Sequence, residues 1–183
     1  MTTTTADRYR ELARAFEAKI GAVRPDQWVA PTPCDGWTVR DLVRHVVDTQ
    51  GLFEGMVGRD LGEIPSVDDE PTAAFAAASA VVQSDLDDPA RAEETFEGFF
   101  GTSTFAQAID RFACFDLVVH GWDLARATGQ EETIEPVEIE RVMASTELFG
   151  PNLRTSGVCG PEVEVGEDAS AQDRLVAFLG RQP

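Results

Sequence analysis

The sequence predicts an all-α protein, a four-helix bundle with additional short helices and a C-terminal segment that wraps the domain. Two observations carry this prediction. Four long segments repeat apolar residues every three or four positions, which is the spacing of an amphipathic helix. No pair of segments shows the alternation and turn residues of a convincing strand pair. The whole chain, residues 1–183, is expected to form a single domain, because this length suits one hydrophobic core.

The first two helices are predicted from their apolar stripes and their ends. Residues 5–23 place Leu12, Phe16 and Ile20 four apart, and Pro25 ends this helix. A proline-rich loop follows. Residues 38–41 then form a capping-box pattern that starts a helix over 39–56. Its inner face carries an apolar stripe that includes one histidine, namely Leu42, His45, Val46, Thr49 and Phe53.

The remaining helices follow the same reasoning. An alanine-rich helix is predicted over 72–86, and the longest stripe predicts one continuous helix over 104–128 that ends at Gly129. Pro136 opens a helix over 137–149, with Ile139, Met143 and Leu148 facing inward. Residues 150–168 are predicted to wrap the domain as a loop, before a last short helix over 171–179. Residues 95–101 are interpreted as extended or as a turn.

Composition excludes several classes of function. The chain has 15 Lys and Arg against 33 Asp and Glu, a formal net charge of −18, which repels nucleic-acid phosphates and anionic membrane surfaces. The acidic stretches 68–70 and 85–94 are expected to be solvated loops. The first residues resemble no secretory signal, no segment is apolar enough to span a membrane, and three widely spaced cysteines indicate reduced thiols. A cytoplasmic protein is therefore expected, with a small molecule as its partner.

The two histidines of the chain carry the main functional hypothesis. Asp116 and His120 are four apart on the stripe of the long helix, so their side chains project from one face. His45 lies on the inner stripe of another helix, and packing of the two helices brings all three together. Two imidazoles and one carboxylate suit a divalent transition metal, first zinc, with nickel, iron and manganese as alternatives.

Other interpretations of the same residues stay open. Asp116 and His120 also fit a structural helical pair, and His45 fits a core histidine. Cys34, before a helix N-terminus, is a less favoured nucleophile. The four arginines near the ligand segments are candidates for holding a substrate carboxylate, although a surface role suits each better, and the three tryptophans are interpreted as core residues: Arg40, Arg44, Arg111, Arg126, Trp28, Trp37 and Trp122.

Three segments resemble a known family. They are residues 26–28 with 31–45, residues 118–129, which read VVHGWDLARATG, and residues 169–175 with 179–181. Together they resemble the DinB-like metal-binding proteins related to the N-terminal domain of mycothiol-dependent maleylpyruvate isomerase. The resemblance implies a four-helix bundle whose metal ligands match His45, Asp116 and His120. It departs at Asp116, where the isomerase has glutamate.

Two functional hypotheses compete, and the resemblance bears on the first. The first is a thiol-dependent S-transferase in which the metal activates a low-molecular-weight thiol such as mycothiol or bacillithiol. Maleylpyruvate isomerisation itself is not expected, because the isomerase has an extra C-terminal domain and this sequence stops soon after its bundle. The second is a non-enzymatic stress or scaffold protein in which the metal stabilises the bundle. A homodimer is compatible with the resemblance, although no apolar stripe marks an interface.

Overall fold

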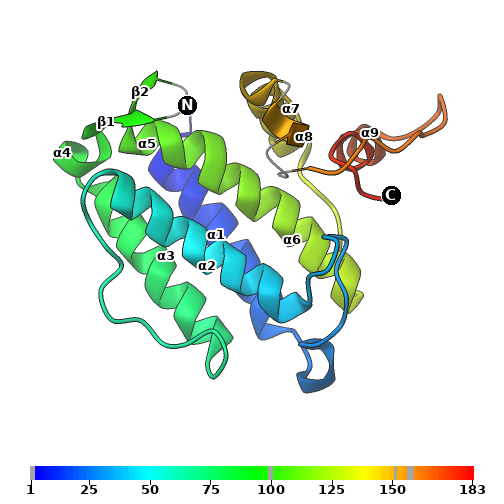
Figure 1. Cartoon of the computed structure of the whole chain (residues 1–183), viewed down its shortest axis with the longest axis horizontal. Coiled ribbons are helices and arrows are strands. Elements are labelled where there is room, and N and C mark those ends of the chain that lie inside the picture. Colours follow the sequence, from blue (N-terminus) through cyan, green and yellow to red (C-terminus); the bar gives the residue numbers. More distant parts are fainter. Residues whose placement is uncertain (1–2, 99–100, 151, 156–158) are drawn as a thin grey trace.

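The computed structural model describes residues 3–98, 101–150, 152–155 and 159–183. Helices dominate it, which confirms the predicted all-α class (Figure 1). The long helices are α1 (Thr5–Gly21), α2 (Val39–Met56), α3 (Pro71–Asp87), α6 (Cys114–Thr128) and α7 (Pro136–Phe149). Shorter ones are α4 (Pro89–Ala92), α5 (Phe105–Ala108), α8 (Asn152–Thr155) and α9 (Ala171–Phe178), with 3₁₀ turn η1 (Pro25–Gln27) and π-helical turn η2 (Ile109–Ala113).

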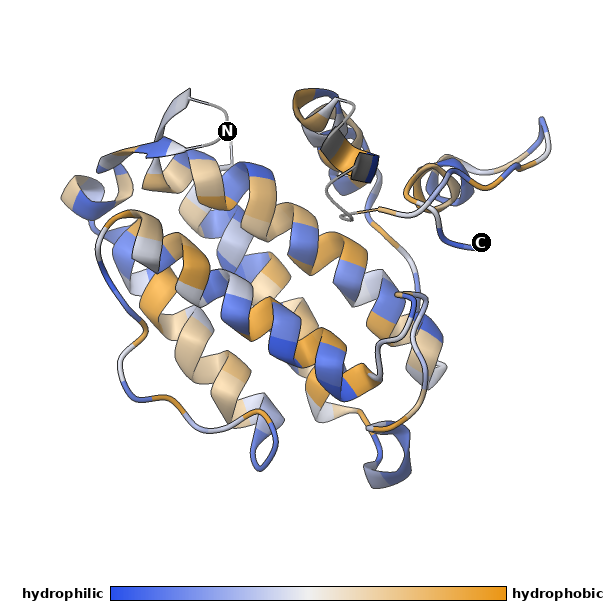
Figure 2. Ribbon diagram, in the orientation of Figure 1, coloured by the Kyte–Doolittle hydropathy of each residue, from blue (hydrophilic) through white to orange (hydrophobic). Residues whose placement is uncertain are grey.

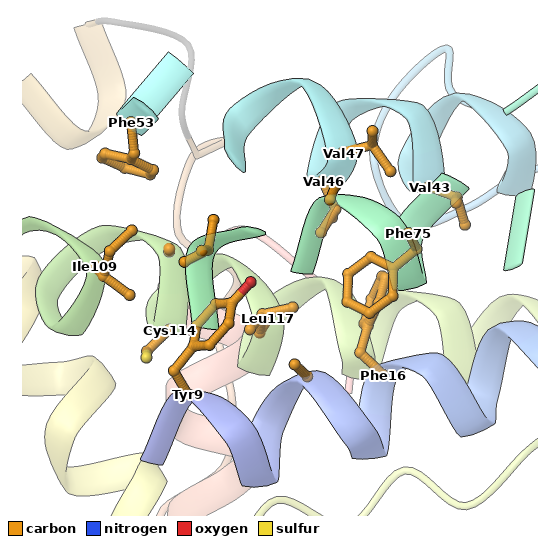
Figure 3. Packing of buried hydrophobic residues seen from close by; sticks show 14 of the residues in the cluster. Tyr9, Phe16, Val43, Val46, Val47, Phe53, Phe75, Ile109, Cys114 and Leu117 are labelled. Atoms are coloured by element: carbon orange, nitrogen blue, oxygen red, sulfur yellow. The ribbon is translucent and has the colours of Figure 1, made fainter. Parts of the chain in front are cut away.

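Helices α1, α2, α3 and α6 form the four-helix bundle. Helix α1 packs on α3 and α6, and α2 packs on the same two helices, so α1 and α2 are diagonal partners. Figure 3 shows side chains from all four pointing toward one another, among them Tyr9, Phe53, Phe75 and Leu117. Figure 2 shows α3 coloured mostly toward the hydrophobic end of the scale, as its alanine-rich sequence requires.

Local sequence signals fix where the site-bearing helices begin and end. The Thr38 side chain accepts a hydrogen bond from the Asp41 amide, and the Asp41 carboxylate accepts one from the Thr38 amide, so the predicted capping box is present. Helix α6 ends at Gly129, whose φ of 70° is the left-handed conformation that glycine adopts most readily. The predicted start of α2 and the predicted end of α6 are therefore confirmed.

Helix α6 is buried on both sides. One face, which includes Leu117 and Leu124, belongs to the bundle core. The opposite face carries Phe115, Val119 and Trp122 into a second core formed with the C-terminal helices. Figure 1 shows α7, α8 and α9 on the side of α6 away from α3. A helix that is apolar around its circumference requires cover on both sides.

The predicted continuous helix over 104–128 needs a correction. The helical run is interrupted by η2, one π-helical turn between α5 and α6. A π turn contains an extra residue and shifts the faces of the helix that follow it. Ile109 and Ala113 stay in the bundle core, whereas Phe112 lines the pocket described below. The turn lies immediately before the segment that carries Asp116 and His120.

The prediction that no strands pair is wrong. Strands β1 (Thr95–Gly98) and β2 (Gly101–Thr104) form an antiparallel pair in which Thr95 faces Thr104. A strand of four residues is too short to show a clear alternating pattern, which explains why the sequence did not reveal the strand pair. The extended alternative for residues 95–101 is confirmed where the structure describes them, whereas 99–100 lie outside the described residues.

The inward face of α7 also differs from the prediction. Met143 and Leu148 are 39% and 49% exposed, whereas Val142 is fully buried. Glu138 is buried as well, because its carboxylate binds the Arg8 guanidinium of α1, with Nε–Oε2 3.0 Å. This ion pair links α7 to α1, and an apolar pattern alone does not detect it.

The C-terminal segment is only partly a loop. Helix α8 lies within the predicted wrapping loop 150–168, of which residues 151 and 156–158 lie outside the described residues, as do residues 1–2. The final helix is confirmed as α9. Among the described residues, no helix is both long and apolar enough to cross a bilayer.

The acidic stretch 85–94 is not wholly solvated. Asp85 belongs to α3 and is 1% exposed, and it contacts the Arg59 guanidinium at 3.0 Å. The same guanidinium lies 3.2 Å from the carboxylate of buried Glu54 of α2. Arg91 of α4 forms a further hydrogen bond to Asp85. One end of the bundle thus contains a buried group of charges, whereas residues 68–70 are exposed as expected.

Candidate metal centre

A pocket of about 850 Å³ lies over α6. Helix α2 forms one wall, and the end of α7 with the C-terminal segment forms another. The loop before α2 and the β1–β2 pair supply further lining residues. Elements that are far apart in the sequence therefore meet around one cavity.

The three predicted ligands meet at the wall of this pocket. One ligand atom from each of His45, Asp116 and His120 lies within 4.8 Å of the others. His45 Nε2 is 3.6 Å from Asp116 Oδ2, and the two imidazole centroids are 5.1 Å apart at 82°. His120 is buried, whereas the His45 side chain is 36% exposed, so His45 faces the pocket rather than the closed core that its stripe predicted.

The proline-rich loop before α2 covers one side of this group. The Thr32 amide donates to the Trp37 carbonyl at 2.9 Å, and Gly36 takes a φ of 75° that closes the turn. The Trp37 ring lies 4.8 Å from the His45 ring and 6.0 Å from the His120 ring, between centroids. Trp37 thus packs against the bundle core, as the sequence predicted, and its ring also lines the pocket and packs on both histidines.

Asp123 and Arg181 form a hydrogen-bonded pair beside Nδ1 of His120. His120 Nδ1 is 3.0 Å from Asp123 Oδ2, and Arg181 binds both carboxylate oxygens of Asp123, at 3.1 and 2.9 Å. Asp123 is completely buried. Burial alone raises its pKa, but hydrogen bonds with His120 and Arg181 outweigh this and lower the pKa to about 2. The ionised carboxylate fixes the ring, which leaves Nε2 of His120 for a metal.

Sequence reasoning missed both residues of this pair. Asp123 follows His120 by three positions, a helical spacing that places both side chains on neighbouring parts of one face. That spacing was a usable signal. Arg181 lies 58 residues beyond Asp123, so no local pattern connects them.

Cys34 lies beside the same histidine. Its Sγ is 3.3 Å from Asp123 Oδ2 and 3.9 Å from His120 Nδ1, which makes Cys34, His120 and Asp123 a second group with ligand spacing. Burial, followed by the charge of Asp123, raises the pKa of the Cys34 thiol to about 12. Without a metal, a protonated thiol is a poor nucleophile, and Arg181 already binds both oxygens of Asp123. The group with His45 and Asp116 therefore fits a metal better.

The four arginines that were candidates for holding a substrate carboxylate lie elsewhere, which agrees with the preferred surface role. Arg40 donates to backbone carbonyls of Val67 and Asp68, and Arg44 pairs with Asp41 and Asp68. Arg126 pairs with Glu132 and stacks on Trp122. None of these three, nor Arg111, lines the pocket.

Comparison with known proteins shows which family the chain resembles. The family model described as "Mycothiol maleylpyruvate isomerase N-terminal domain" matches residues 9–125, a span that contains all three candidate ligands. Two uncharacterized proteins of Mycobacterium tuberculosis, MT0763 of strain CDC 1551 / Oshkosh and Rv0738 of strain H37Rv, are each 36% identical over 169 residues. Each alignment covers 91% of this chain and 92% of the relative. No solved structure shows significant similarity to the chain.

Proposed function

Because the chain belongs to the mycothiol maleylpyruvate isomerase N-terminal domain family, we propose that it binds a divalent metal and uses it in thiol-dependent S-transfer. His45, Asp116 and His120 are the proposed ligands. The observation that carries the proposal is their convergence at the wall of an open pocket, rather than in a closed core. Zinc is the first candidate, and nickel, iron and manganese suit the same ligand types.

The geometry of the three residues fits such an ion. Ligand atoms about 2.1 Å from a tetrahedral zinc are about 3.4 Å from one another. The observed 3.6 Å between His45 Nε2 and Asp116 Oδ2 is close to this separation. Three ligands leave a position that faces the pocket, and a carboxylate behind His120 is the arrangement that orients metal-bound histidines.

The chemistry follows from that open position. A bound divalent metal favours the thiolate form of a coordinated thiol, which is the nucleophilic form. The residues of the chain supply the rest: Asp123 and Arg181 orient His120, and Trp37 packs on both imidazoles. A low-molecular-weight thiol such as mycothiol or bacillithiol is the proposed cosubstrate.

Elemental analysis of purified variants tests the metal site. We expect about one equivalent of metal in the native protein, and less than about a tenth of that in His45→Ala and His120→Ala, because each loses one of three ligands. Thr49→Ala is the matched control, since Thr49 lines the pocket one turn after His45 on α2. Full metal content in both histidine variants would falsify the site.

A second measurement separates S-transfer from a non-enzymatic role. The metal-loaded protein is assayed with mycothiol, bacillithiol and glutathione in parallel, against a halogenated aromatic electrophile. Product formation that His45→Ala and His120→Ala abolish supports the transferase. Stoichiometric metal with no product from any of the three thiols would favour a protein in which the metal stabilises the bundle.

A further inference from the structure

We call the three candidate metal ligands, His45, Asp116 and His120, the ligand group. From this group the pocket extends into an apolar arm along α2 and α6. Thr49, Phe53 and Met56 follow His45 on α2 at spacings of three or four, so they continue the same side of the helix. Opposite them, Phe112 precedes Asp116 by four residues. We define the apolar arm by seven lining residues: Leu52, Phe53, Met56, Phe96, Phe112, Phe115 and Phe149.

The aromatic rings of this arm hold one another in place. Phe53 and Phe112 stack with an interplanar angle of 5° and centroids 6.3 Å apart. Phe149 of α7 meets Phe112 edge-on, with centroids 5.4 Å apart, and lies 5.8 Å from Phe115. Rings from α2, η2, α6 and α7 thus form a preorganised apolar surface, which lowers the ordering cost of binding a flat apolar ligand.

The charges of the pocket lie at its other end. Among the described lining residues, the acidic and basic side chains apart from histidine are Asp35, Asp116 and Arg181. Arg181 is 6% exposed, binds both oxygens of Asp123, and also donates to the Leu179 carbonyl. A substrate carboxylate therefore finds no unpaired cation among these lining residues. The net charge of −18 further repels anions.

We propose that the apolar arm binds an uncharged aromatic electrophile and presents its reactive carbon to the ligand group. This inference rests on the proposed S-transfer. In the reaction, the thiol sulfur forms a bond to the aromatic carbon, a halide leaves with the electron pair of its carbon–halogen bond, and the thiol proton passes to solvent. A pocket of about 850 Å³ is large enough for a substrate of this class.

Binding of three matched probes to the purified protein tests the proposal without thiol or turnover. The probes are methoxynaphthalene, naphthoate and naphthylmethylammonium, titrated by calorimetry with and without added zinc. In the titration without zinc, we expect the uncharged probe to bind roughly tenfold or more tightly than either ion, because the arm offers no partner to a charge. The metal-free titration makes this result independent of the metal site.

A charge introduced at the arm checks where the probes bind. Leu52 is 59% exposed, so Leu52→Arg disturbs no core contact while placing a cation at the arm. We expect Leu52→Arg to weaken methoxynaphthalene roughly tenfold and to tighten naphthoate, which reverses the preference between them. Val29→Arg is the matched control, since Val29 is 77% exposed and does not line the pocket.

The outcomes separate this inference from the proposed function. Tighter binding of either ion by the native protein, or an unchanged preference in Leu52→Arg, overturns the apolar-ligand assignment. If methoxynaphthalene binds as expected but no thiol reacts with chlorodinitrobenzene, S-transfer fails while the apolar arm stands as a ligand site. If transfer occurs equally with carboxylated and uncharged electrophiles, the function stands and the arm does not select substrates.

Discussion

Asp123 shows how one buried carboxylate can organise a site that it does not enter. An ionised carboxylate with no water contact is costly unless hydrogen bonds satisfy it. Here Arg181 occupies both oxygens, and His120 and Cys34 approach Oδ2. The charge is therefore kept at neutral pH, and its direction fixes the orientation of the imidazole.

We expect Asp123→Asn to weaken metal binding about 10- to 100-fold, the range typical for loss of a group that orients a ligand. The amide keeps the shape of the side chain but loses the charge that holds His120 and Arg181. Zinc affinity is measured by competition with a chromogenic chelator.

A companion variant guards against misfolding. Asp123→Asn combined with Arg181→Gln removes both charges of the pair, and its circular dichroism should match that of the native protein. Unchanged zinc affinity in a folded Asp123→Asn protein would show that Asp123 has no role in orienting His120.

For single residues, the sequence predicts contacts between side chains that share a helix or an apolar stripe. Asp116 and His120 were identifiable because they lie four apart, and His45 because it is the one other histidine. Arg181 was not, and neither was the contact of Cys34 with Asp123, because both residues reach Asp123 through tertiary packing, over 58 and 89 residues. Buried ion pairs leave no periodic signal, which is also why Asp85 was interpreted as a solvated residue.

Among the elements, α7 depends on a polar contact for its position. The Arg8 guanidinium of α1 binds Glu138 of α7 through Nε and Nη2, and also reaches the Asp110 carboxylate of η2 at 2.8 Å. Both Arg8 and Glu138 are less than 10% exposed. Three elements are thus joined at one guanidinium.

We expect Arg8→Met to lower the free energy of unfolding by about 1–3 kcal/mol, because the buried Glu138 carboxylate loses the Arg8 guanidinium and keeps only the hydrogen bond from Arg141. Urea denaturation measures the change. Arg8→Met with Glu138→Leu replaces both charges by apolar groups, and should recover most of the loss. An Arg8→Met protein as stable as the native one would contradict the structural role of the pair.

The helices themselves were largely predictable, whereas the interruptions between them were not. The boundaries of α2, α3 and α9 follow from capping residues and periodicity that are local in sequence. The π turn η2 and the β1–β2 pair depend on how neighbouring elements pack. The π turn has five residues and each strand has four. Short segments carry too few repeats for a period to be recognised.

For the whole molecule, the buried charges at one end of the bundle couple stability to pH. Burial, together with the neighbouring Asp85 carboxylate, raises the pKa of Glu54 from 4.5 to about 7, although Arg59 and Arg91 act in the opposite direction. The folded protein therefore holds this proton more tightly than the unfolded chain. The resulting stabilisation is complete below pH 4.5 and is lost as the pH rises to about 7.

We expect Glu54→Gln to reduce this pH dependence, because glutamine cannot ionise. The free energy of unfolding of the native protein should fall from pH 5 to pH 8 by more than that of Glu54→Gln, as measured by urea denaturation. Glu63→Gln, at an exposed loop position, is the control and should follow the native protein. Parallel pH profiles for the native protein and Glu54→Gln would refute the shifted carboxyl.

Helix α6, enclosed by two cores, has a consequence for the timescale on which the site persists. Backbone amides exchange with solvent only when their helix opens, and α6 opens only if the bundle core and the C-terminal core separate from it. Asp116 and His120 therefore keep their relative positions through local fluctuations and lose them only in global unfolding. The His45 side chain is more accessible than that of Asp116, at 36% exposed against 19%. In the proposed metal site, solvent would therefore reach His45 first.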